Sequence, residues 1–220
     1  YTIDGIFQDQ QQVDNHAQQT AKAIGRWIYR DANGDGVIND NDRTFIGNPH
    51  PKFEYSLNSR LYYKNFDFNI FIQGVYGNKI AFASKAGQSS IDFWGDYTNK
   101  SVRILDTWTV NNRDAKLPEI NILNPNGEST KVSTYLLEDG SYLRVKNMEL
   151  GYTLPSTILS KINVKHCRVF LNTENILTIS KYNSVNNDPE VTSTDRTKGV
   201  DDINRLALAK IYSIGFNFMF

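Results

Sequence analysis

Residues 53–63 read FEYSLNSRLYY, and residues 66–77 read FDFNIFIQGVYG. In both stretches apolar or aromatic residues alternate with polar ones, and a period of two is typical of a β-strand with one apolar face. Only Lys64 and Asn65 separate the two stretches. The pattern therefore predicts an antiparallel hairpin with a very short turn, apolar on one face and polar on the other.

The same alternation returns three times toward the end of the chain. Further strands are predicted within residues 141–154, 164–179 and 205–220. In the first of these, Arg144 and Lys146 are expected to continue the face that carries Met148 and Leu150, at its outer end. Five antiparallel strands therefore give an all-β fold.

The connections between the predicted strands alternate in length. Residues 78–140 and about 180–204 form long polar segments, whereas the other connections are short. A compact globular domain rarely carries such long loops, but membrane β-barrels have long loops on one side and short turns on the other. The pattern favours a segment of a transmembrane barrel. Five strands cannot close a barrel, since the smallest have about eight, so this chain is expected to be part of something larger.

Composition excludes several other classes of protein. The 24 Lys and Arg residues equal the 24 Asp and Glu residues, which argues against nucleic-acid binding. A single cysteine excludes an internal disulfide and a cysteine-based zinc site. No apolar run approaches the 18 residues of a transmembrane helix. We find no phosphate-binding glycine loop, nucleophile elbow or zinc-protease motif, and we expect no enzyme activity.

One stretch has a strong chemical pattern. Residues 31–42 read DANGDGVINDND and resemble the calcium loop of an EF-hand. Calcium takes six to eight oxygen ligands, and alternate residues of a tight loop turn their oxygens toward one point. Gly36 stands where the loop must turn sharply, and Ile38 is expected to anchor it on an apolar surface. The candidate ligands are Asp31, Asn33, Asp35, Val37 through its carbonyl, Asn39 and Asp42.

Calcium binding is not the only interpretation of this loop. Asp, Asn and Gly all favour turns, so the stretch also fits a turn that binds nothing. If calcium binds, Asp42 in place of the usual Glu predicts modest affinity, and the ion is expected to be one structural site in an extracellular loop.

Five stretches of the chain together resemble one protein family. They are IDGIF at residues 3–7, YRDANGDGVINDNDRTFIGNPHPKF at 29–53, SYLRVKNMELGYTLP at 141–155, RVFLNTENILTISKYNSVNNDPEV at 168–191 and SIGFNFMF at 213–220. In order and spacing they are similar to the C-terminal end of SusC/RagA-type TonB-dependent transporters of Bacteroidota. The resemblance covers nearly the whole chain.

The resemblance implies an outer-membrane importer of glycans or peptides. Residues 1–52 would be an extracellular loop, and residues 53–220 would supply about five C-terminal strands of a 22-stranded barrel. Expected partners are a SusD-like surface lipoprotein, outer-membrane lipid, the barrel-assembly machinery and an oligosaccharide or peptide substrate. The plug domain and the TonB-contacting segment of the family are missing from this chain, so TonB is expected to act through that other part.

Two further sets of residues follow from this interpretation. The last strand resembles the targeting strand of outer-membrane barrels, in which the assembly signal would comprise Tyr212, Ile214, Phe216, Phe218 and Phe220. Aromatic residues of the long middle segment are candidates for substrate contact, or else they pack the loop itself: Trp94, Tyr97 and Trp108.

A soluble protein remains the alternative. A calcium-stabilised β-sandwich that binds carbohydrate would show the same alternation, because each of its sheets also has one apolar face. The two interpretations differ in what the apolar face contacts. A sandwich buries it against a second sheet, whereas a barrel exposes it to lipid.

Overall fold

The computed structural model describes residues 1–85, 99–121, 126–128, 130–160, 164–182, 188–191, 198–201 and 208–220. The chain divides into two compact units. Unit 1 comprises Tyr1–Asn48, Ile80–Glu138 and Thr192–Asn204, and unit 2 comprises Pro49–Lys79, Asp139–Val191 and Arg205–Phe220.

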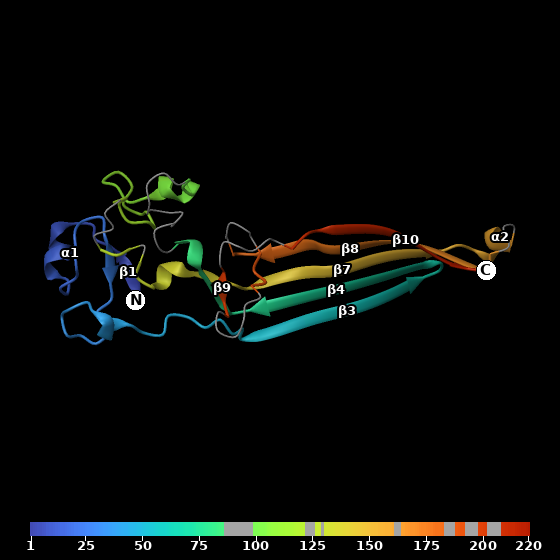
Figure 1. Cartoon of the computed structure of the whole chain (residues 1–220), viewed down its shortest axis with the longest axis horizontal. Coiled ribbons are helices and arrows are strands. Elements are labelled where there is room, and N and C mark those ends of the chain that lie inside the picture. Colours follow the sequence, from blue (N-terminus) through green and yellow to red (C-terminus); the bar gives the residue numbers. More distant parts are fainter. Residues whose placement is uncertain are drawn as a thin grey trace. The chain divides into compact units, whose positions relative to one another are not determined.

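Unit 2 is built on a five-stranded antiparallel sheet with the strand order β10-β8-β7-β4-β3 (Figure 1). Its strands are β3 (Phe53–Tyr63), β4 (Phe66–Tyr76), β7 (Tyr142–Thr153), β8 (His166–Ser180) and β10 (Ile211–Met219). The predicted hairpin is confirmed, and Lys64 in its turn adopts a φ of 53°. The last strand begins at Ile211 instead of residue 205, and residues 202–207 lie outside the described part.

Strand register separates the sheet into two chemically different faces. Residues paired across neighbouring strands point to the same face. One row across all five strands is apolar: Leu61, Phe68, Leu150, Leu171 and Ile214. The adjacent row, on the opposite face, is polar: Arg60, Asn69, Glu149, Asn172 and Ser213. The alternation seen in the sequence therefore becomes one apolar and one polar face.

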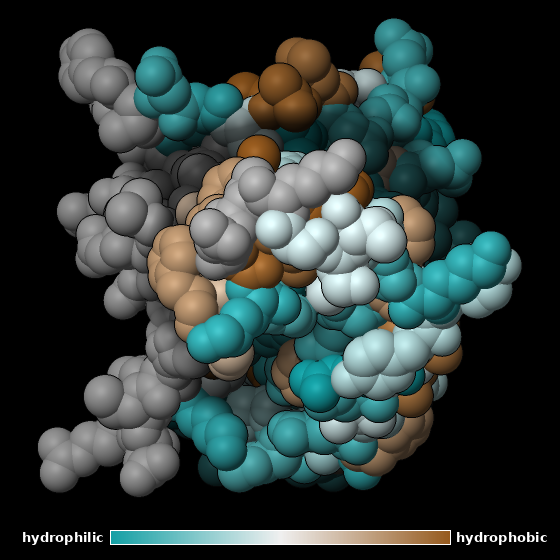
Figure 2. Space-filling view, turned by 90° about the vertical axis from the view of Figure 1, so that its right-hand side faces the viewer, coloured by the Kyte–Doolittle hydropathy of each residue, from teal (hydrophilic) through white to brown (hydrophobic). Residues whose placement is uncertain are grey.

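The apolar face is open to its surroundings. Leu57, Leu61 and Ile214 are 56%, 60% and 71% exposed, which a sheet buried in a sandwich would not allow. The exposed fractions contradict the β-sandwich alternative. Figure 2 likewise shows hydrophobic residues, in brown, at the surface among hydrophilic ones in teal.

The predicted orientation of Arg144 was wrong. The registers of β7 with β4 and with β8 both shift beside Lys146, so this residue lies in a β-bulge. Beyond an extra residue in a strand, each side chain points to the opposite face of the sheet from the one that strict alternation predicts. Arg144 therefore pairs with Gln73 and Thr178 on the polar face, not with the side that carries Met148.

Unit 1 consists of short elements joined by loops. Strand β1 (Ile3–Ile6) pairs with β2 (Trp27–Tyr29) in an antiparallel ribbon, and a further sheet has the order β6-β5-β9. The remaining elements are α1 (Gln10–Asn15), β5 (Lys79–Phe82), β6 (Leu137–Asp139), β9 (Val200–Asp201) and the 3₁₀ helices η1 (Asp40–Asp42), η2 (Ala83–Lys85), η3 (Val102–Asp106) and η4 (Thr134–Leu136), while α2 (Ser156–Leu159) lies between β7 and β8 in unit 2. No helix in the described ranges is both long enough and apolar enough to cross a membrane.

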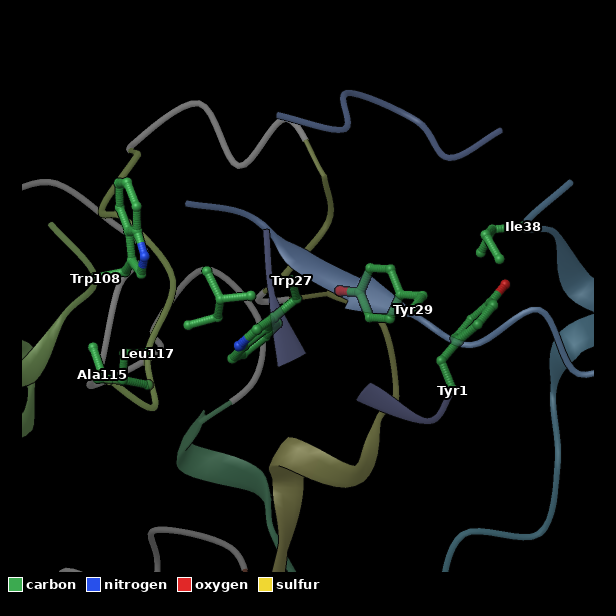
Figure 3. Close-up of a cluster of buried hydrophobic side chains, with 8 residues drawn as sticks. Tyr1, Trp27, Tyr29, Ile38, Trp108, Ala115 and Leu117 are labelled. Carbon is green, nitrogen blue, oxygen red and sulfur yellow. The ribbon is translucent and has the colours of Figure 1, made fainter. Parts of the chain in front are cut away.

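An aromatic cluster forms the core of unit 1 (Figure 3). Its buried members are Tyr1, Ile6, Trp27, Tyr29, Ile38, Trp108, Ala115 and Leu117. Gly25 fits tightly against this core, because a Cβ atom there would lie 2.8 Å from Cε3 of Trp108. Its φ of 81° also belongs to the left-handed region that favours glycine.

We expect Gly25→Ala to destabilise unit 1 by roughly 1–3 kcal/mol, because alanine would both strain the backbone and displace the Trp108 ring. Denaturant unfolding followed by circular dichroism measures the change. Gly5→Ala is the matched control, since a Cβ there meets nothing within 4 Å. Equal stability of the two variants would contradict the tight packing at Gly25.

Candidate functional site

The loop that follows β2 contains the predicted metal ligands. The carboxylate of Asp31 accepts the N–H groups of Gly34 and Gly36, at 2.7 and 2.8 Å. Both glycines have positive φ, 76° and 82°, which lets the chain wrap tightly around this carboxylate. The left-handed glycines therefore set the curvature that the sequence motif predicts.

The next two ligand candidates repeat this local bonding. The side-chain oxygen of Asn33 accepts the N–H of Asp35 at 3.0 Å, and Asp35 accepts the N–H of Val37 at 2.9 Å. Asn33 and Asp35 are exposed. An oxygen that accepts one N–H retains a second lone pair, so these bonds leave capacity for a cation.

Asp42 closes the loop from the inside. It is only 1% exposed, and its two carboxylate oxygens accept the N–H groups of Ala32 at 2.8 Å and Asn39 at 2.7 Å. The Asn39 amide is the main cause of a lowered pKa at Asp42, with smaller contributions from the Ala32 and Asn33 amides and the Asp31 side chain. The carboxylate thus ties the start of the loop to its end.

Ile38 anchors the loop to the aromatic core of unit 1, as the sequence predicts. It is 8% exposed and belongs to the aromatic core. On either side, the N–H of Gln18 donates to the carbonyl of Gly36 at 2.7 Å, and the N–H of Ile38 donates to the carbonyl of Gln18 at 2.9 Å. The loop therefore has a fixed base while Asp31 to Asp35 remain near the surface.

The acidic side chains of this loop do not form a compact cluster. Across the described residues, no three His, Cys, Asp or Glu side chains are arranged to hold a metal ion. The candidate ligands of the loop offer carboxylate, amide and backbone carbonyl oxygens, which is the hard-oxygen chemistry of calcium ligands. The calcium site stays a prediction.

The polar face of the sheet holds two arginine-centred networks that the sequence analysis missed. Arg168 on β8 donates from Nε to Asp67 on β4 at 2.9 Å and from Nη2 to Glu149 on β7 at 2.6 Å. The guanidinium crosses over Gly151, where a Cβ atom would collide with Nη2. The arginine thereby links three strands, and the glycine leaves the space for it.

The second network lies where the long connections join the sheet. Arg144 donates to Asp188 and to Glu190, each at 2.6 Å, and its side chain is 2% exposed. Lys146 also donates to Glu190, at 2.6 Å. Sequence alternation alone could not find this cluster, because the bulge at Lys146 has no signature in the pattern of apolar residues.

No family model matches the chain. Over 166 residues the chain is 30% identical to TonB-dependent receptor P3 of Formosa agariphila. This alignment covers 76% of the chain and 15% of that receptor. Over 194 residues it is 25% identical to TonB-dependent receptor SusC of Bacteroides thetaiotaomicron. This alignment covers 88% of the chain and 17% of SusC. The chain therefore spans less than a fifth of the length of these relatives.

The fold also resembles that of a solved structure. The RagAB peptide importer in its open-open state superimposes with a TM-score of 0.72 over 100% of this chain and 22% of that chain, at 23% identity.

The chain is a homologue of SusC-type TonB-dependent receptors. Its relatives are receptors and transporters, not enzymes.

Within this SusC-type segment, the aromatic candidates of the long connection have different positions. Trp94 and Tyr97 lie outside the described residues. Trp108 is 5% exposed in the unit 1 core, and its indole N–H donates to the side-chain oxygen of Gln8 at 2.9 Å. The Trp108 ring therefore packs in the loop's own core, and its contact with a substrate stays a prediction.

The last strand of this SusC-type segment displays its aromatic side chains. Tyr212, Ile214, Phe216, Phe218 and Phe220 are all more than half exposed. The rings of Phe216 and Phe218 stack with centroids 6.1 Å apart. Their role as an assembly signal stays a prediction.

We expect Asp42→Ala to loosen the loop of this receptor segment even in the presence of a chelator, because it deprives the Ala32 and Asn39 amides of their acceptor. Amide hydrogen exchange of residues 31–42 should become faster. Asn41→Ala is the control, since Asn41 is exposed in the same loop and its side chain does not accept the Ala32 or Asn39 amide. Unchanged exchange in Asp42→Ala would show that the carboxylate does not hold the loop closed.

Proposed function

We propose that this chain forms part of the wall of an outer-membrane β-barrel importer of the SusC/RagA type. The observation that carries the proposal is the exposed apolar face of the five-stranded sheet, opposite a face of polar and charged residues. In a barrel the first face would contact lipid and the second would line the interior. The kinship with TonB-dependent receptors supports the same assignment.

Aromatic residues gather at both ends of the apolar face. At one end the rings of Phe53 and Tyr76 lie 5.2 Å apart, and at the other the rings of Phe66 and Tyr152 lie 4.7 Å apart. Membrane barrels carry such aromatic girdles on either side of an apolar band about 25 Å tall. The length of β3, at about 3.3 Å per residue and tilted by about 40°, spans a band of that height.

The edges of the sheet support a larger assembly. In the described part of the chain, β3 and β10 each pair with one strand only. Their outer backbone groups would be unsatisfied in a membrane unless other strands pair with them. We propose that the rest of the polypeptide supplies those strands to about 22 in total, together with the plug and the TonB-contacting segment.

The proposed cargo is a glycan or a peptide. RagAB, which shares the fold, is a peptide importer, and SusC is a TonB-dependent receptor. Unit 1 is built mainly from residues 1–48 and the long connections. We place it outside the cell, where a SusD-like lipoprotein would contact it. The C-terminal strand would engage the barrel-assembly machinery in the outer membrane.

We further propose that residues 31–42 bind one structural calcium ion. The support is the spacing of oxygen ligands, the two left-handed glycines, and the base that Ile38 provides. Affinity is expected to be on the order of 10⁻⁴–10⁻³ M, as in other extracellular modules.

A lipid-quenching experiment tests the membrane assignment. A fluorophore at Leu57→Cys should be strongly quenched by brominated lipid around the full-length receptor, because this side chain lies on the apolar face. The same label at Asn58→Cys, on the opposite face, is the matched control. Both variants carry Cys167→Ser. Equal quenching at the two positions would overturn the proposal.

Metal binding is tested by titration calorimetry. Asp31→Ala combined with Asp35→Ala should abolish calcium binding, because it removes both surface carboxylates of the loop. Asp14→Ala in α1 removes an exposed carboxylate elsewhere in unit 1 and should leave binding intact. Calcium retained by the double variant would refute the site, as would the absence of binding to the unaltered protein.

A further inference from the structure

Residues 188–191, which we call the clamped segment, are fixed to the polar face of the sheet by one arginine. Arg144 donates from Nη2 to Asp188 and from Nη1 to Glu190, each at 2.6 Å. Charge-assisted bonds of this kind are shorter and stronger than bonds between neutral groups, and one planar guanidinium here connects two different carboxylates. The Arg144 side chain is 2% exposed, and the side chains of Asp188 and Glu190 are 13% and 26% exposed, so the arginine end of both ion pairs is buried.

Every side of this guanidinium is occupied. Its Nε donates to the hydroxyl of Thr178 on β8 at 2.9 Å, and its Cζ lies 5.4 Å from the ring centre of Tyr142, which is itself buried. Arg144 is therefore held in one orientation by β7 and β8 before it reaches the clamped segment.

The clamped segment is organised from its own side as well. Asp188 accepts the N–H of Glu190 at 3.0 Å and the N–H of Leu208 at 3.0 Å. Glu190 accepts two further bonds from Nζ of Lys146, at 2.8 and 2.6 Å. Two cations and two carboxylates therefore balance, and the cluster carries no net charge.

The cluster lies near one end of the sheet. Arg144 is the third residue of β7, at the end of the sheet where the long connections attach. The bulge at Lys146 turns it to the polar face, where it pairs with Gln73. If the polar face lines a channel, the clamped segment lies inside the mouth of that channel and not above it.

We propose that Arg144 is a positioning residue that holds residues 188–191 inside the barrel mouth, where they narrow the import path. This inference rests on the proposed function, because the polar face lines a channel only in a barrel. Removal of Arg144 leaves the largely buried carboxylate of Asp188 without a cation and leaves Glu190 with Lys146 alone. Loss of the partner of a largely buried charge is strongly unfavourable. The segment is then expected to leave the wall.

Hydrogen exchange in the full-length receptor, held in lipid nanodiscs, tests the clamp. In Arg144→Met, the peptide that contains residues 188–191 should exchange at least about tenfold faster, with the β4 peptide unchanged. Arg144→Lys keeps the charge but not the fork of donors, and should have an intermediate effect. Arg60→Met is the control, since Arg60 is exposed on the same face. Unchanged exchange in Arg144→Met would overturn the clamp.

A size-selective labelling experiment tests the narrowing. Gln73→Cys, in a Cys167→Ser background, is treated from outside with a small thiol reagent and with one of oligosaccharide size. The large reagent should react much more slowly than the small one, and Arg144→Met should reduce this difference at least about fivefold, as expected for release of a packed segment. An identical ratio with and without Arg144 would show that the segment does not narrow the path.

The barrel and the clamp can be tested separately. Loss of lipid quenching at Leu57 removes the barrel, and the channel interpretation with it. Normal quenching at Leu57 combined with unchanged exchange or unchanged size selectivity removes only the role of Arg144.

Discussion

A sheet with one apolar face must keep that face out of water, and nearly every feature of unit 2 follows from this constraint. The register places large aliphatic and aromatic side chains of five strands in continuous rows, and these rows are exposed. Burial of an exposed leucine in an apolar medium contributes about 1.5–3 kcal/mol, so the summed driving force toward lipid or another apolar partner is large. In the proposed barrel, lipid is that partner.

The polar face has the opposite requirement, because charges that leave bulk water need partners. Arg168 satisfies this by linking Asp67 and Glu149 across three strands, and Arg144 satisfies it by holding Asp188 and Glu190. The first network is internal to the sheet and the second connects the sheet to a loop. Both occur at irregular places, one beside a glycine and the other beside a bulge, where a regular strand would leave no room.

The strands could be predicted from the sequence, because the alternation of apolar and polar residues is recognised from residues that are close together in the chain. The hairpin at Lys64 and Asn65 is set by local turn chemistry and a local pattern. Its first strand has the expected limits, and its second ends one residue earlier, at Tyr76. The face of the sheet to which Arg144 points could not be predicted. It depends on the bulge at Lys146, which is defined only by the register of β7 with β4 and β8. The position of Trp108 was equally hidden, because its contacts with Gln8 and Gly25 join parts of the chain far apart in sequence.

Ile38 connects the oxygen-rich loop to the aromatic core, and this has a spectroscopic consequence. The same core contains the indoles of Trp27 and Trp108. A movement of the loop that shifts Ile38 changes the packing of this aromatic core, beginning with Tyr1 beside it (Figure 3), and the spectra of aromatic side chains are sensitive to their packing. The protein thus contains its own optical reporter for events at residues 31–42, without any added dye.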